Sequence, residues 1–166
     1  SDTLPVTGLG AFAGFGPGNA VVQVAAGSCH TVCVTEDGRA FSWGNGGSGQ
    51  LGLGETLAAV EPTLVEGMSP ALQVSAGSCH TLCVTRKGCL FAWGSGFDGA
   101  LGLAHMEFPL HKWGQVAPRR VSGRLEGRVV AQTSARYQHS LCVDRPGDMF
   151  AWGNNQSGQL GLGRLK

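Results

Sequence analysis

The sequence has few charged residues and no long hydrophobic run. Lys, Arg, Asp and Glu make up 14% of its 166 residues, against 42% hydrophobic ones, which excludes a strongly charged, disordered chain. No apolar stretch approaches the roughly 18–20 residues that a membrane-spanning helix needs. No secretory signal and no long amphipathic helix with caps at both ends can be recognised. These absences predict a globular intracellular protein, cytoplasmic or nuclear, with no membrane partner.

The net charge of +1 predicts no general attraction to nucleic acids or membranes. The charges are nevertheless unevenly distributed along the chain. Residues 1–66 carry six acidic and one basic side chain, and residues 67–166 carry five acidic and eleven basic ones. The positive charge is concentrated at Lys112, Arg119, Arg120, Arg124, Arg128 and Arg136.

Glycine is abundant, with 28 residues spread over the whole chain, which indicates many tight turns and a β-rich fold. Three segments align with one another: residues 21–54, 71–104 and 129–163. Each contains one histidine and one tryptophan at fixed positions: His30, His80 and His139, and Trp43, Trp93 and Trp152. The step between the histidines is 50 residues and then 59. The chain is therefore a repeat protein.

Each copy contains several short strand patterns. In the first copy, Val21 to Ala26 and His30 to Thr35 are apolar, β-branched runs, and Asp37-Gly38 then suits a tight hairpin turn. A further extended piece contains a Pro-x-x-Val motif, at Pro62 in the first copy. Three or four strands in about 50 residues match one propeller blade. A single blade cannot bury both faces of its sheet, so we expect an all-β array of stacked blades.

The repeated motif is A-G-x-x-H-[ST], a short strand, x-x-G, a hydrophobic–aromatic pair, W-G and then G-Q-L-G-x-G. It resembles the regulator-of-chromosome-condensation repeat over nearly the whole chain. The resemblance implies a seven-bladed β-propeller of four-stranded blades, with repeats at about 20–65, 71–121 and 129–163 of a partial propeller domain, 1–166. Arg136 departs from the motif, because glycine stands at this position in the other two copies.

Three repeats are too few for such a ring, because seven blades need about 350 residues at this period. Three blades alone would leave open sheet surfaces and unpaired edges, which promote aggregation. We therefore expect the remaining blades to come from the rest of a longer parent chain. The alternative is that other copies of this chain supply them.

Several chemical motifs are better explained by the repeat. Gly-x-Gly-x-x-Gly motifs begin at Gly44 and Gly94. A dinucleotide site requires a strand before this motif and a helix after it, and the sequence does not predict that arrangement here. Cys33, Cys83 and Cys142 recur at one position inside a strand, where cysteine packs as a small hydrophobe, so we expect neither a metal site nor disulfides. No carboxylate recurs beside the histidines to form a catalytic triad. We expect the repeated histidines and tryptophans to be structural, and we expect no cofactor, no catalytic residue and no small-molecule substrate.

Residues that do not repeat are the candidates for binding, because repeated residues build the scaffold. The insert 104–117 brings large apolar groups into a connection between blades: Met106, Phe108 and Trp113. An arginine cluster follows: Arg119, Arg120, Arg124, Arg128 and Arg136. Each has a structural alternative, since the insert can fold back over a blade and the arginines can form a solvated blade edge.

The sequence therefore predicts a protein-interaction scaffold that binds a protein partner through its non-repeating loops. The family resemblance leaves a second hypothesis, guanine-nucleotide exchange on a small GTPase with association to chromatin. In that case the chain would distort the nucleotide site of its partner without chemistry on its own residues. A hydrolase or nucleotide-binding enzyme is the hypothesis that the residues favour least.

Overall fold

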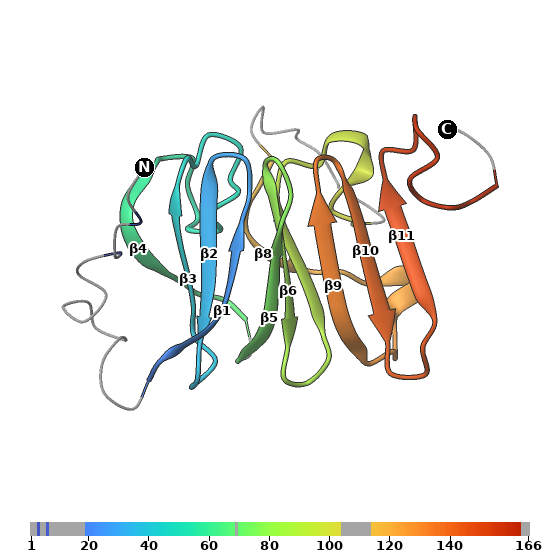
Figure 1. Cartoon of the computed structure of the whole chain (residues 1–166), viewed down its shortest axis with the longest axis horizontal. Coiled ribbons are helices and arrows are strands. Elements are labelled where there is room, and N and C mark those ends of the chain that lie inside the picture. The colour runs from blue at the N-terminus through green and yellow to red at the C-terminus, as the bar shows by residue number, and fades with distance from the viewer. Residues whose placement is uncertain (1–2, 4–5, 7–18, 69, 104–113, 164–166) are drawn as a thin grey trace.

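The structure is a computed structural model that describes residues 3, 6, 19–68, 70–103 and 114–163. It contains three antiparallel sheets that stand side by side (Figure 1). The first sheet comprises β1 (Val21–Ala26), β2 (His30–Thr35), β3 (Ala40–Gly44) and β4 (Ala59–Val65). The second comprises β5 (Ala71–Ala76), β6 (His80–Thr85), β7 (Leu90–Gly94) and β8 (Gln115–Arg120). The third comprises β9 (Val130–Arg136), β10 (His139–Asp144) and β11 (Met149–Gly153).

Each sheet is a meander in which every strand pairs with the next one along the chain. The tight turns between the second and third strands follow from glycine: Gly38 has φ +87° and donates its N–H to the carbonyl of Thr35 at 2.9 Å. Within the described part of the chain, short 3₁₀ helices lie in two connections, η2 (Phe97–Gly99) and η3 (Gly123–Leu125). The described residues contain no α-helix, and no helix among them is long and apolar enough to cross a membrane.

The hydrophobic core lies between the sheets. One cluster joins the first and second sheets: Val32, Val34, Ala40, Val65, Ala71, Val74, Cys83 and Trp93. The other joins the second and third sheets: Leu82, Val84, Leu90, Ala92, Leu101, Val121, Leu125, Val130 and Cys142. The first strand of each later sheet packs against the sheet before it, β5 on β1 and β2, and β9 on β5 and β6. The sheets are thus stacked propeller blades, as the sequence predicts, and we call them the first, second and third blades.

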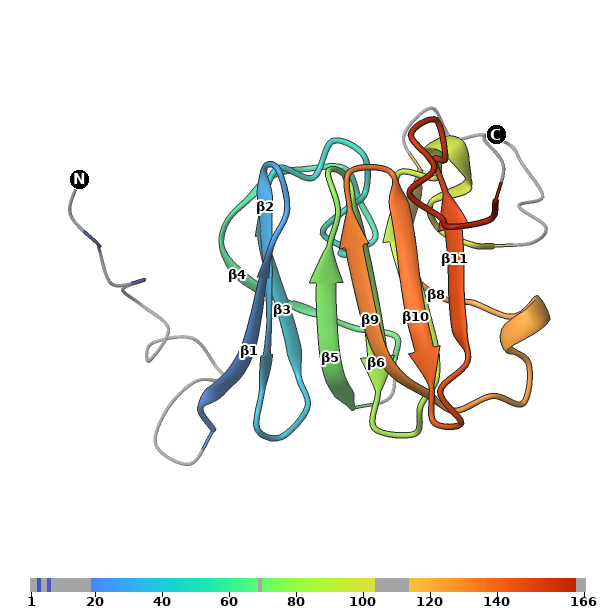
Figure 2. The same cartoon turned by 45° about the vertical axis from the view of Figure 1, so that its right-hand side comes forward.

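The two ends of the blades carry different kinds of loop (Figures 1 and 2). The turns between the first and second strands of each blade lie at the upper end of the view, together with the glycine-rich loops after β3, β7 and β11. The turns between the second and third strands, and the connections from each blade to the next, lie at the lower end. We call these the upper end and the lower end.

Candidate functional site

The repeated histidine and tryptophan meet at the boundary between two blades. The ring Nε2 of His30 in the first blade lies 2.9 Å from the hydroxyl of Thr81 in the second. That hydroxyl donates to the backbone carbonyl of Gln50 at 2.8 Å, and the indole N–H of Trp93 donates to the same carbonyl at 2.9 Å. Because the threonine proton is directed at the carbonyl, its oxygen accepts from the histidine N–H. Four residues thereby connect the blades.

The same arrangement occurs between the second and third blades. His80 Nε2 lies 2.9 Å from the hydroxyl of Ser140. Ser140 donates to the carbonyl of Ala100 at 2.7 Å, and the indole of Trp152 donates to it at 2.8 Å. A hydroxyl residue therefore follows the repeated histidine because it accepts a hydrogen bond from the histidine of the preceding blade.

Burial keeps the histidines of both junctions neutral. Desolvation lowers the pKa of His30 and of His80 to about 4. A neutral ring with its proton on Nε2 is the form that donates to the neighbouring hydroxyl. The geometry therefore gives these two residues a role in joining the blades.

His139 of the third blade differs from the other two. No hydrogen bond joins its ring to another described residue, whereas the rings of His30 and His80 each contact a hydroxyl of the next blade. At Gly27 and Gly77 an added Cβ would overlap the ring of the following histidine. Arg136 brings a Cβ to that position, so the ring of His139 has to take a different place.

Three of the six cysteines pack in the core. Cys33, Cys83 and Cys142 are buried free thiols, and burial raises their pKa to about 11, 12 and 11 respectively. Among the residues that the structure describes, no group of three His, Cys, Asp or Glu side chains could hold a metal ion.

The structure separates Arg136 from Arg128, which is close to it in the sequence. Arg128, at the lower end, pairs with Asp144 and Asp148, and its guanidinium lies 4.8 Å from the ring centre of Phe150. Arg136 lies at the upper end, at the opposite end of β9. Arg119 and Arg120 are exposed on the outer strand β8, and Arg124 is exposed in η3. A binding role for the arginine cluster stays a prediction.

The predicted insert lies mostly beyond the residues that the structure describes. Met106, Phe108 and Trp113 fall outside the described residues. Of the range 104–117, only residues 114–117 are described, and β8 begins within them. The role of these three side chains stays a prediction.

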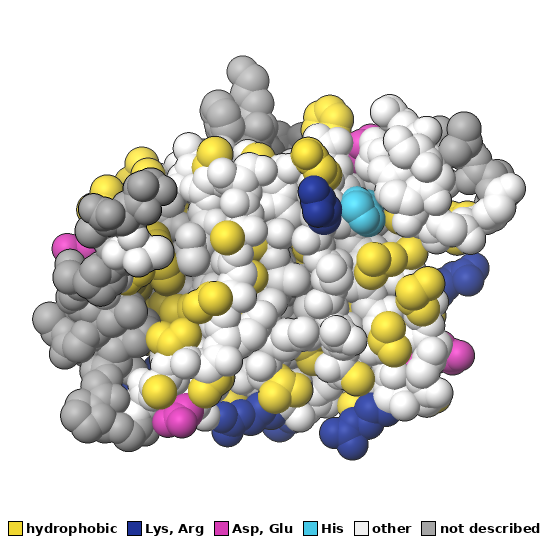
Figure 3. Space-filling view, in the orientation of Figure 1, with side chains coloured by type: hydrophobic (Ala, Val, Ile, Leu, Met, Phe, Trp, Pro, Cys, Tyr) yellow, Lys and Arg dark blue, Asp and Glu magenta, His cyan; other side chains and the backbone are white. Residues whose placement is uncertain are grey.

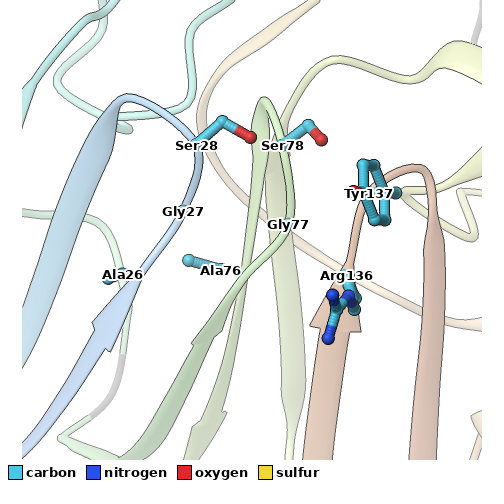
Figure 4. A pocket seen from close by; sticks show the side chains of 8 residues that line it. All are labelled: Ala26, Gly27, Ser28, Ala76, Gly77, Ser78, Arg136 and Tyr137. Atoms are coloured by element: carbon cyan, nitrogen blue, oxygen red, sulfur yellow. The ribbon is translucent and has the colours of Figure 1, made fainter.

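The third blade breaks the repeat at its upper turn (Figure 4). Arg136 and Tyr137 stand where the first two blades have glycine and serine. The guanidinium of Arg136 lies 5.5 Å from the ring centre of Tyr137, and Tyr137 has φ +46°, an unusual value for a residue other than glycine. The three turns surround a hollow of about 220 Å³, which Arg136 and Tyr137 line on one side.

A second exposed ring lies close to this turn. A hollow of about 100 Å³ is lined by Phe97 of η2 and by Tyr137, and the two residues are 68% and 67% exposed. Figure 3 shows hydrophobic, basic and histidine side chains gathered in this part of the upper end. We call Phe97, Arg136 and Tyr137 the upper-end patch. Sequence reasoning noted Arg136 as a departure from glycine but missed Tyr137 and Phe97.

Comparisons with known proteins agree with this repeat architecture. The family described as "Regulator of chromosome condensation (RCC1) repeat" matches residues 37–84, 87–143 and 146–166. The ultraviolet-B receptor UVR8 of Arabidopsis thaliana is 30% identical over 143 residues, which are 86% of this chain and 31% of the receptor. The human probable E3 ubiquitin-protein ligase HERC6 is 38% identical over 141 residues, 84% of this chain and 13% of the ligase. The chain thus spans about a third or less of these relatives.

Solved structures share the fold. Human WBSCR16 superposes with a TM-score of 0.76 and 28% identity, over 89% of this chain and 37% of that one. Prp20p of Saccharomyces cerevisiae, whose structure was described with its binding properties to Gsp1p and histones, gives a TM-score of 0.75 at 21% identity, over 87% of this chain and 36% of its own. The chain belongs to the regulator-of-chromosome-condensation (RCC1) repeat family and consists of blades of its β-propeller.

Proposed function

We propose that the chain is a protein-interaction module and that the upper-end patch is the part of it that contacts a protein partner. The observation that carries the proposal is the replacement of a glycine–serine turn by Arg136 and Tyr137, both exposed beside an open hollow. The scaffold residues repeat from blade to blade, whereas these two do not. Tyrosine and arginine are also among the residues that contribute most to protein interfaces.

The chemistry of the patch indicates what kind of surface would fit it. The exposed rings of Phe97 and Tyr137 offer apolar area, which gains free energy when a partner removes it from water. The guanidinium of Arg136 pairs with no described acid, and it offers a forked donor to a carboxylate. The fitting partner is a protein surface with an acidic side chain next to an apolar one.

The proposal is tested by replacing Arg136 and Tyr137 with the residues that the other two blades have at these positions. The double variant Arg136→Gly, Tyr137→Ser gives the third blade the residues of the other two, so we expect it to fold with an unchanged melting temperature. We expect it to lose the partners that the parent chain captures from a cell extract, measured by quantitative mass spectrometry. Arg145→Ala, an exposed arginine at the lower end, is the control. An identical set of captured proteins with the double variant would overturn the proposal.

Nucleotide exchange on a small GTPase is the second candidate function, and its support is the likeness to Prp20p, described with Gsp1p. At 21% identity this likeness shows the fold alone. A nucleotide-release assay on a panel of small GTPases tests it directly, and a panel that stays loaded with nucleotide excludes exchange by this chain.

An intracellular location is part of the same proposal. All six cysteines are free thiols, and disulfides are rare in the cytosol and nucleus. Cell fractionation of the tagged protein separates the cytoplasmic from the nuclear alternative.

A further inference from the structure

Ser122 follows a pair of arginines at the end of the outer strand of the second blade. Arg119 and Arg120 precede it by three and two residues, in the run Arg-Arg-Val-Ser. An arginine stands three residues before a serine or threonine at two places in the chain, Arg39 before Ser42 and Arg119 before Ser122. Only Ser122 also has an arginine two residues before it. The spacing thus selects two serines whose surroundings can be compared.

These two serines have opposite surroundings. Ser42 in β3 is 0% exposed and donates its hydroxyl to the carbonyl of Leu51 at 2.7 Å. Ser122 is exposed in the connection between β8 and η3. Its hydroxyl does not cap η3 and has no hydrogen-bond partner among the described residues. An enzyme can therefore reach the hydroxyl of Ser122, whereas that of Ser42 is enclosed in the core.

The two arginines before Ser122 are also accessible. Arg119 and Arg120 are exposed at the end of β8, and neither forms an ion pair with an acid that the structure describes. The first and third blades pack on the two faces of the second blade, whereas β8 forms its outer edge. Both guanidinium groups are therefore available to carboxylates of another protein.

The backbone at Ser122 is extended. Its φ of −124° and ψ of −147° continue the course of β8, and Gly123 with φ +72° then turns the chain into η3. Val121 holds this stretch to the blade, because its side chain is 5% exposed and its N–H donates to the carbonyl of Leu90 at 2.8 Å. Local opening of these contacts at the end of an edge strand frees the segment for an enzyme cleft.

We propose that Ser122 is phosphorylated by an arginine-directed protein kinase, which recognises Arg119 and Arg120 through carboxylates in its substrate groove. The γ-phosphoryl group of ATP moves to Oγ of Ser122. A bond forms between this oxygen and phosphorus, the bond from phosphorus to the β-phosphate oxygen breaks, and ADP leaves. The hydroxyl proton passes to an aspartate of the kinase. The site does not use the upper-end patch, so it is independent of the proposed function.

The phosphate would change the charge of this part of the lower end. Residues 115–127 carry three arginines and one acid, Glu126, and their net charge is the difference, +2. A serine phosphate adds a charge of about −1.5 to −2 at neutral pH, so the segment becomes nearly neutral. The arginines beside Ser122 can donate charge-assisted hydrogen bonds to the phosphate oxygens. The modification thereby converts a basic surface into a neutral one.

Incubation of the purified chain with ATP and the catalytic subunit of cAMP-dependent protein kinase, an arginine-directed kinase, tests the proposal. We expect one phosphate per chain, located at Ser122 by fragmentation mass spectrometry, and no phosphate on a Ser122→Ala chain. A parent chain that carries no phosphate at Ser122 after this incubation would overturn the proposal. So would a Ser122→Ala chain that is phosphorylated at the rate of the parent.

The kinetics of phosphorylation test the role of the arginines. Arg119→Gln, Arg120→Gln removes both charges, so we expect kcat/KM for this chain to fall at least about tenfold. Arg124→Gln is the matched control, because it removes an exposed arginine on the other side of the same serine, and it should be phosphorylated at the parent rate. All three side chains are exposed, so the melting temperatures should be unchanged. Equal rates for the double variant and the control would contradict recognition through Arg119 and Arg120.

Discussion

The two junctions between blades have the same hydrogen bonds but differ in how deeply they are buried. Trp93 of the first junction is fully buried, because its blade is covered on both sides. Trp152 of the second is partly exposed, because no further described blade covers the other side of its sheet. Both indoles nevertheless donate to a loop carbonyl at 2.9 and 2.8 Å. The comparison shows that the polar contacts define how two blades meet, whereas the amount of buried apolar surface depends on the neighbours.

Removing either tryptophan should lower the free energy of unfolding more than the other changes considered below, and the loss should differ most clearly between the two junctions. Trp93→Ala empties a closed core, and large-to-small changes of this kind cost about 3–5 kcal/mol. Trp152→Ala removes a ring that is already partly in water, so we expect a loss of about 1–3 kcal/mol. Chemical denaturation of both variants measures the difference. Equal losses would show that the indole hydrogen bond, common to both, outweighs burial.

Counted for each residue, the next largest effect should be the pH dependence of stability that His30 and His80 cause. His30 and His80 have a pKa of about 4 in the folded chain and about 6.5 when unfolded. Between these values the unfolded chain takes up protons that the folded chain does not, so stability falls as the pH falls from about 6.5 to 4 and is unaffected by them above that range. The full loss is roughly 3 kcal/mol for each histidine.

Denaturation midpoints measured at several pH values check this expectation. A His30→Gln, His80→Gln variant serves as the comparison, since it lacks both titrating rings. The variant should show a flatter profile between pH 6.5 and 4. A parent chain with the same slope as the variant would place the acid sensitivity elsewhere.

The repeat allowed much of the fold to be predicted, but the partners of its residues could not be predicted. The all-β stack follows from short apolar runs, turn glycines and the recurrence of His30 and Trp43 at fixed positions. That Trp93 reaches back to the carbonyl of Gln50, 43 residues away, depends on how one blade packs on another. No local pattern contains this information.

The candidate binding surface could not be predicted from local sequence patterns either. Arg128 and Arg136 are near each other in sequence, but β9 extends between them, and a strand rises about 3.3 Å per residue. The strand therefore carries Arg136 to the upper end and leaves Arg128 with Asp144 and Asp148 at the lower end. The substitution of Tyr137 for serine was visible in the aligned repeats and was the available signal for the upper-end patch.

Removing the hydroxyl of each junction tests whether the hydrogen bonds of the two junctions contribute equally to stability. Thr81→Val and Ser140→Ala each remove the group that accepts from a histidine and donates to a loop carbonyl. The histidine Nε2–H is then left buried without a partner, which costs about 1–3 kcal/mol. Because both hydroxyls are buried and their contacts are the same, we expect nearly equal losses, unlike those for the tryptophans. A loss confined to Thr81→Val would show that the second junction is opened by water and that its hydrogen bonds stabilise the stack only when a further blade covers them.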